Sequence, residues 1–174
     1  ARVFAENDLW LIDDEVYDRQ IWKGQDVSPR SLDGMVDRTL VVGSVAKSHA
    51  MTGIRRSAVR EPENIIALRE DLTPHTNYGV AGFIQYAEVA ALKLGPEFEA
   101  KLSEPSRRRR DIALRIVANS NIVTAIPANG SMYVMLDVRA TGLSGDAFAN
   151  HLLDTHKIAV MPGESFGNAA SGHI

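Results

Sequence analysis

Hydrophobic residues near the start of the chain fall into two short continuous runs, each closed by polar or small residues. The run at residues 9–12 (LWLI) ends at Asp13, and the run at residues 40–42 (LVV) ends at Gly43. Continuous runs of this length are typical of strands buried on both faces of a parallel sheet, although a buried helical turn gives the same pattern. About twenty residues separate the runs, enough for the crossover that parallel strands require. We therefore expect two parallel strands, with residues 54–59 returning as an antiparallel neighbour.

The middle and end of the chain show helical spacing and then a mixture of strands and helix. Residues 80–94 are followed by a glycine, which is a helix stop signal. A longer helix is expected over residues 96–117, with Pro105 kinking or interrupting it. The remainder predicts a strand, a strand, a helix capped by Ser144 and a strand, at residues 121–126, 131–138, 145–156 and 157–162. The pattern predicts an α/β fold with a domain boundary in the long helix, giving domains at residues 1–97 and 98–174.

Composition and charge narrow the classes of protein. With 174 residues, 45% of them hydrophobic, the chain can bury a core. A formal net charge of −3 gives no general attraction to nucleic acid or to an anionic membrane. The absence of cysteine excludes disulfides and thiolate metal sites. No run spans a bilayer and no secretory leader opens the sequence, so we expect a cytoplasmic protein that binds neither nucleic acid nor membrane.

Two conspicuous groups of residues receive structural interpretations. The arginine run Arg107–Arg110 has acidic neighbours in Glu104 and Asp111, which favours a solvated helix face over a nucleic-acid contact. His151 and His156 have no carboxylate partner at ligand spacing, so we predict no metal site.

Candidate chemistry gathers where the two predicted parallel strands end. In open α/β sheets, ligands bind beyond the carboxyl ends of the strands. These ends deliver Asp13 and Asp14 from one strand and Ser44 and Lys47 from the next, which brings a carboxylate and an amine to one site. An ion pair at the end of the sheet, with Arg55 and Arg56 as ordinary surface charges, explains the same pattern.

The spacing Ser44-x-x-Lys47 also occurs in penicillin-recognising acyl enzymes, where the serine is the nucleophile. That arrangement requires Ser-Asp-Asn and Lys-Thr-Gly further along the chain. Neither tripeptide occurs here, which argues against this class of enzyme.

Two longer segments resemble a known family. DEVY (Asp14–Tyr17), followed by SVAKSHAMTGIR (Ser44–Arg55), is similar to the signature of class I/II aminotransferases, which are fold-type I pyridoxal-phosphate enzymes. Three later segments resemble the same family, at residues 129–138, 141–153 and 158–167. The resemblance implies the carboxyl-terminal half of such an enzyme: the end of a mostly parallel large-domain sheet, then a small α+β C-terminal domain.

The resemblance also implies a role for each signature residue. Lys47 would form a Schiff base with the aldehyde of pyridoxal 5'-phosphate and then move a proton on the substrate. Asp14 would face the pyridine nitrogen and keep it protonated, so that the ring accepts electrons. Tyr17 would hydrogen-bond the phenolic oxygen, while Ser44 and Arg55 would hold the phosphate.

By the same resemblance, the reaction would move an amino group between an amino acid and a 2-oxo acid in a homodimer. Asn77 and Tyr78 would lie near the neighbouring subunit's active site, whereas His49 is interpreted as local packing. The alternatives are a β-elimination lyase with the same cofactor, the aminotransferase-like effector domain of a transcriptional regulator, and a truncated homologue that acts as a folded partner.

Several family features are missing from this sequence. The chain enters its first apolar run without a preceding helix or an initiating methionine, so we interpret it as a piece of a longer protein. The upstream glycine loop, stacking aromatic and asparagine of the family are absent. The arginine that would grip the substrate carboxylate would come directly after Ile174. We therefore expect the isolated chain to be inactive.

Overall fold

The computed structural model describes residues 1–76 and 78–174. By internal contacts the chain divides into two compact units, Ala1–Glu104 and Pro105–Ile174, which are described separately below. The division lies inside α5 (Gly95–Val117), the same helix in which the sequence places its domain boundary.

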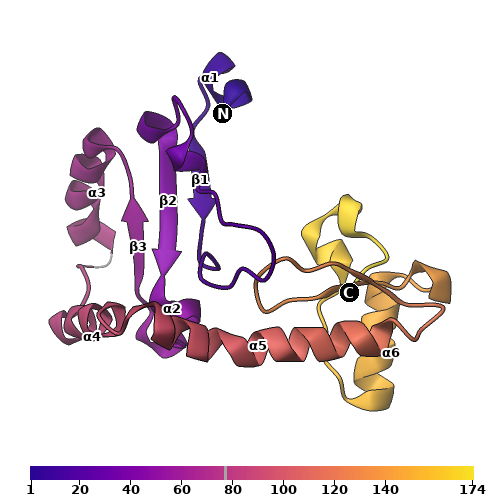
Figure 1. Ribbon diagram of the computed structural model, residues 1–174. Helices are drawn as coiled ribbons and strands as arrows, with labels where there is room; N and C mark the ends of the chain where they lie inside the picture. Colours follow the sequence, from indigo (N-terminus) through magenta and orange to yellow (C-terminus); the bar gives the residue numbers. More distant parts are fainter. Residues whose placement is uncertain (77) are drawn as a thin grey trace. The chain divides into compact units, whose positions relative to one another are not determined.

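The first unit is built on a three-stranded sheet whose order is β1 (Leu11–Asp14), β2 (Thr39–Ser44) and β3 (Ser57–Arg60). Figure 1 shows β2 between the other two strands. The β1 and β2 strands are parallel, and β3 runs antiparallel to β2, which confirms the predicted topology. Each strand begins or ends a few residues from the predicted position.

Two short 3₁₀ turns, η1 (Pro29–Ser31) and η2 (Val36–Arg38), lie in the crossover between β1 and β2. Arg30 fastens this segment to the sheet, because its Nη1 donates a hydrogen bond of 2.8 Å to the carbonyl of Thr39. Met35 lies between the two turns and is almost fully buried, as are Thr39 and Val41 on β2. These three buried side chains belong to the core of the first unit.

Besides the single helical turn at Val45–Ser48, two helices of the first unit were not predicted. The expectation of no helix before the first apolar run is wrong, since α1 (Arg2–Glu6) precedes it. The second is α3 (Glu63–Thr76), which contains Pro74 close to its end. The helix α1 is only five residues long, and the apolar residues of α3 do not gather on one face, so neither shows the apolar stripe by which a helix is predicted.

The predicted helices of the middle region are confirmed. They are α4 (Gly82–Leu92) and α5, which continues through Pro105 without interruption (Figure 1). Residues 107–109 are exposed, as a solvated helix face requires. Arg110 bonds instead to the Asp111 carboxylate and, over 3.1 Å, to the carbonyl of Ala128. Among the described residues, no helix is both long enough and apolar enough to cross a lipid bilayer.

The second unit contains a two-stranded antiparallel sheet, β4 (Thr124–Ile126) and β5 (Met135–Asp137), and the helix α6 (Gly145–His156). Both strands and the helix lie in the predicted segments. The hydroxyl of Ser144 accepts a hydrogen bond of 3.1 Å from the Ala147 amide, which confirms the predicted N-cap.

The strand predicted at residues 157–162 is wrong. The last residues of the chain pair with β5 instead: Leu136 and Ile174 exchange two backbone hydrogen bonds of 2.9 Å, and His173 forms a bridge to Asp137. Lys157 ends α6 in the left-handed conformation, and the apolar side chains of Ile158 and Met161 are left exposed. Residues 157–162 are therefore apolar enough for a strand, but in the described part of the chain they pair with no other strand.

Candidate functional site

The register of the first sheet places Asp14 and Ser44 on one face. Asp14 is opposite Val42 in the parallel pair, and Ser44 lies two residues further along β2. Because side chains alternate between the faces of a sheet, Asp14, Val42 and Ser44 project to the same side. The ends of β1 and β2 thus present a carboxylate and a hydroxyl together.

A tight turn leads from Asp14 to Tyr17. The Oδ1 atom of the exposed Asp14 accepts a hydrogen bond of 3.1 Å from the Val16 amide, an arrangement that reverses the chain at the end of a strand. The Gln20 amide then donates a bond of 2.8 Å to the carbonyl of Tyr17. The Tyr17 side chain is half-buried.

Lys47 lies on α2 (Val45–Ser48), a single helical turn that follows β2 directly. Ser44 caps this turn, because its Oγ accepts a hydrogen bond of 3.1 Å from the Ala46 amide. The Nζ atom of Lys47 lies 5.9 Å from the centre of the Tyr17 ring, within the range of a cation–π contact. The fold therefore brings together the predicted lysine and tyrosine, which are far apart in the sequence.

The two adjacent arginines have different environments. Arg55 adopts the left-handed conformation, is exposed, and its Nη1 donates one long hydrogen bond of 3.4 Å to the carbonyl of Thr52. Arg56 is half-buried, and its Nε donates a bond of 2.6 Å to Glu88 on α4. Among the described residues, no hydrogen bond or ion pair joins Arg55 to Asp14, Ser44 or Lys47.

The remaining predicted positions are simpler to place. His49 is buried against the ring of Phe98, with 6.0 Å between ring centres, so the interpretation as local packing is confirmed. Tyr78 is almost fully exposed, and Asn77 lies outside the described residues. His151 and His156 lie with their rings 6.2 Å apart, and in the described part of the chain no group of acidic and histidine residues is arranged to hold a metal ion.

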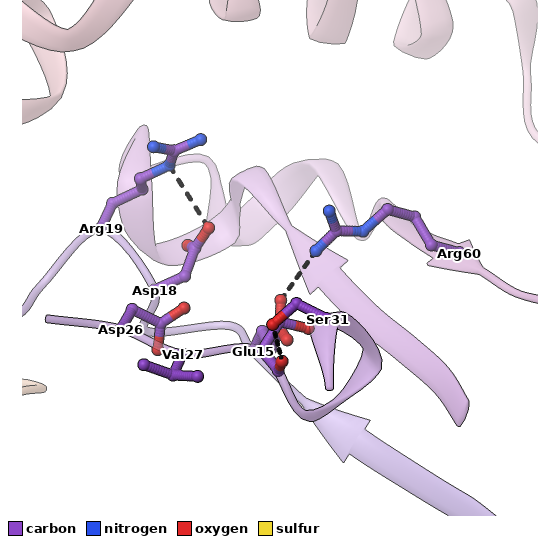
Figure 2. Close-up of a pocket in the computed structure, with 8 residues that line it drawn as sticks. Glu15, Asp18, Arg19, Asp26, Val27, Ser31 and Arg60 are labelled. Atoms are coloured by element: carbon purple, nitrogen blue, oxygen red, sulfur yellow. Dashed lines mark hydrogen bonds and ion pairs between the residues drawn. The ribbon is translucent and has the colours of Figure 1, made fainter. Parts of the chain in front are cut away.

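A polar cavity of about 500 Å³ begins at the residue after Asp14. Figure 2 shows Arg60 of β3 bonded to Glu15 over 2.7 Å, while Asp18 pairs with Arg19 over 3.3 Å. The Oε1 atom of Glu15 is buried without a hydrogen-bond partner among the described residues. Burial, together with the neighbouring Glu15 carboxylate, raises the pKa of Asp13.

This cavity was not predicted, and strand alternation explains why it is separate from the predicted site. Asp13 is opposite Val41, which is in turn opposite Arg60, so these residues project from the face that Asp14 does not share. Finding the ion pair between Glu15 and Arg60 requires the register of three strands, and a single sequence does not specify that register.

Solved structures of aminotransferases show the same arrangement. The chain superposes on an aromatic aminotransferase from Pyrococcus horikoshii OT3 with a TM-score of 0.93 and 31% identity, covering 99% of this chain and 46% of that one. For a double mutant of Thermus thermophilus aspartate aminotransferase, the TM-score is 0.88 with 28% identity, covering 99% and 44%. The fold is therefore that of the fold-type I, aspartate-aminotransferase-like proteins.

Sequence comparison names the family. The sequence is 46% identical over 175 residues to the arginine–pyruvate transaminase AruH of Pseudomonas aeruginosa, covering all of this chain and 44% of that protein. The profile described as "Aminotransferase class I and II" matches residues 1–174. The chain belongs to this family, and it spans less than half the length of the curated relatives that it matches.

Proposed function

We propose that the complete protein is a pyridoxal-phosphate-dependent aminotransferase, which transfers an amino group from an amino acid to a 2-oxo acid. The observation that carries the proposal is the placement of the Lys47 amine over the Tyr17 ring, beside the end of β1 where Asp14 lies. Family membership supports the same reaction.

The groups at this site match the chemistry of the cofactor. Lys47 provides a primary amine for the aldehyde, and Asp14 provides a carboxylate for the pyridine nitrogen. Tyr17 provides a phenol to hydrogen-bond the phenolic oxygen of the cofactor. Ser44 and Arg55 provide a hydroxyl and a guanidinium for the phosphate. When bound, pyridoxal phosphate supplies an electron-accepting ring that stabilises negative charge on the substrate's α-carbon.

Each side chain would hold or move a proton at a defined atom. The negative charge of Asp14 would keep the proton on the pyridine nitrogen, and the Tyr17 hydroxyl would donate a hydrogen bond to the phenolic oxygen. The Lys47 amine would take the proton from the α-carbon of the substrate. Because α2 is capped by Ser44 at the end of β2, Lys47 is carried on a rigid base.

The two proposed phosphate ligands are not equally available. The hydroxyl proton of Ser44 is donated to the carbonyl of Arg56 over 2.7 Å, so Ser44 must leave this bond to donate to a phosphate. Arg55 is exposed, and a guanidinium has five N–H donors. We therefore assign the main phosphate interaction to Arg55.

The remaining proposals concern the whole protein. Residues 1–97 would belong to the larger, cofactor-binding domain and residues 98–174 to a small α+β domain; the division of the chain within α5 supports this arrangement. We also propose a homodimer located in the cytoplasm. Arginine and pyruvate are the first substrates to test, because the relative at 46% identity is an arginine–pyruvate transaminase.

Borohydride reduction of the full-length protein with pyridoxal phosphate, followed by digestion and mass spectrometry, tests the proposal. We expect one stoichiometric phosphopyridoxyl group on the peptide that contains Lys47, lost in Lys47→Ala and kept in the control Lys23→Ala, which changes an exposed lysine. Asp14→Asn should retain the label and lose most of the transamination between arginine and pyruvate. Labelling spread over several lysines, unchanged in Lys47→Ala, would overturn the proposal.

A further inference from the structure

One carboxylate of the first unit faces both segments that carry the proposed cofactor groups. The side chain of Glu99, on α5, is largely buried, with 14% of its surface exposed. Its Oε1 lies 3.7 Å from Nε2 of His49, two residues after Lys47. Its Oε2 lies 3.7 Å from Nε of Arg19, two residues after Tyr17. Glu99 thus links the turn that bears the lysine to the loop that bears the tyrosine.

The His49 side of this link is fixed from two directions. The His49 side chain is 1% exposed, and its Nδ1 lies 2.9 Å from the hydroxyl of Ser48 on α2. The Ser48 hydroxyl has one proton, and the Ser44 carbonyl lies 3.5 Å away as a second, more distant acceptor. When Ser48 donates to the nearer Nδ1, the ring proton is on Nε2 and faces Glu99. In the described part of the chain, Nε2 is buried without a hydrogen bond, so the Glu99 carboxylate provides its electrostatic partner.

The Arg19 side is more open. The Arg19 side chain is 57% exposed and is shared between Asp18, at 3.3 Å, and Glu99. Its contribution alone is therefore small. Glu99 matters because it is in contact with both His49 and Arg19.

We propose that Glu99 is a positioning residue, which holds the Lys47 turn against the Tyr17 loop and so keeps the Lys47 amine over the Tyr17 ring. The catalytic meaning of this role depends on the proposed function, but the contact between the lysine and the tyrosine does not. No group of Glu99 need touch the cofactor or the substrate.

Reductive methylation of the full-length protein with formaldehyde and cyanoborohydride, without cofactor, tests the role directly. The measured quantity is the methylation rate of Lys47 divided by that of exposed Lys23. Glu99→Gln should raise this ratio by about threefold to tenfold, which lies in the lower part of the range of coupling between residues in contact. The matched control is Glu97→Gln, which removes the same charge from an exposed position on the same helix and should leave the ratio unchanged.

A pair of His49 variants separates positioning from general loss of structure. His49→Gln can place an amide N–H near the position of Nε2, whereas His49→Asn reaches only the position of Nδ1. We expect His49→Gln to keep the wild-type ratio and His49→Asn to match Glu99→Gln. Unfolding would instead raise the reactivity of every lysine. Equal ratios in Glu99→Gln and Glu97→Gln, or in both His49 variants, would overturn the proposal.

Borohydride labelling with pyridoxal phosphate adds the link to function. Glu99→Gln should lower the share of label on Lys47 at limiting cofactor. If wild-type protein shows no selective label on Lys47, the proposed function fails while the methylation ratios still decide the role of Glu99. If wild-type label is selective and neither Glu99→Gln nor His49→Asn changes the methylation ratio, only the positioning role fails.

Discussion

Each unit of the chain contains a half-buried glutamate that joins separate segments, but the two are held by different partners. Glu99 in the first unit faces side chains, an imidazole and a guanidinium, each at 3.7 Å. Glu164 in the second unit accepts hydrogen bonds of 2.9 Å from the backbone amides of Gly145 and Gly172. Backbone donors cannot rotate away, so the second arrangement is rigid, whereas the first adjusts as side chains move.

Glu164, together with the closely packed Gly145 and Gly163, forms a cluster that we call the Glu164 centre. A Cβ atom on Gly145 would lie 2.3 Å from both Glu164 and the carbonyl of His173. A Cβ atom on Gly163 would lie 2.0 Å from the carbonyl of Ala170. The segments that meet at this centre are the start of α6 and the last residues of the chain, which pair with β5.

Gly163→Ala should produce the largest effect, because the added methyl collides with backbone that cannot rotate away. We expect a loss of about 3 kcal/mol in the free energy of unfolding, at the upper end of the cost of overpacking. Urea unfolding of the full-length protein measures it. The control is Gly82→Ala at the start of α4, where a methyl meets no atom within 4 Å, and this change should cost nothing or stabilise slightly. Similar losses in both variants would contradict a rigid centre at Glu164.

Glu164→Gln should have a smaller effect that depends on pH. The backbone hydrogen bond from Gly172, helped by that from Gly145, lowers the pKa of Glu164 in the folded protein. A lowered pKa contributes stability that is fully present above the unfolded value, about 4.3, and is lost as the pH falls through the folded value. Wild-type protein should therefore exceed Glu164→Gln in stability at pH 7, and the difference should shrink below about pH 4. A difference that stays constant between pH 7 and pH 3 would show that the charge of Glu164 has no role.

The sequence predicts the structure best where a short stretch of residues contains the whole pattern. Runs of apolar residues located β1 and β2, and the end of each strand located Asp14 and Lys47. The same reasoning failed at residues 157–162, because pairing with β5 depends on which distant segment competes for its edge. The exposed helix α3 was missed because its apolar residues do not gather on one face and so leave no clear helical period.

The links that hold the site together are equally invisible in the sequence. Glu99, His49 and Arg19 are far apart along the chain, and no spacing rule connects them. The contact between Arg56 and Glu88 is of the same kind. Local reasoning could place the chemical groups at one end of the sheet, but the charges that fix their geometry require the folded structure.

Arg19→Gln should have the smallest effect and provides the sharpest comparison between side-chain and backbone partners. Exposed ion pairs contribute roughly 0–1 kcal/mol, and His49 still contacts Glu99 when Arg19 is lost. The matched variant is Arg30→Gln, since Nη1 of Arg30 donates to the carbonyls of Val36, at 2.5 Å, and Thr39, at 2.8 Å. Losing a cation bonded to backbone oxygens should cost about 1–3 kcal/mol in urea unfolding, clearly more than Arg19→Gln. The contrary result is that Arg19→Gln and Arg30→Gln lower the free energy of unfolding by the same amount. Contacts between side chains would then stabilise the fold as much as contacts to the backbone, and the distinction drawn between Glu99 and Glu164 would no longer hold.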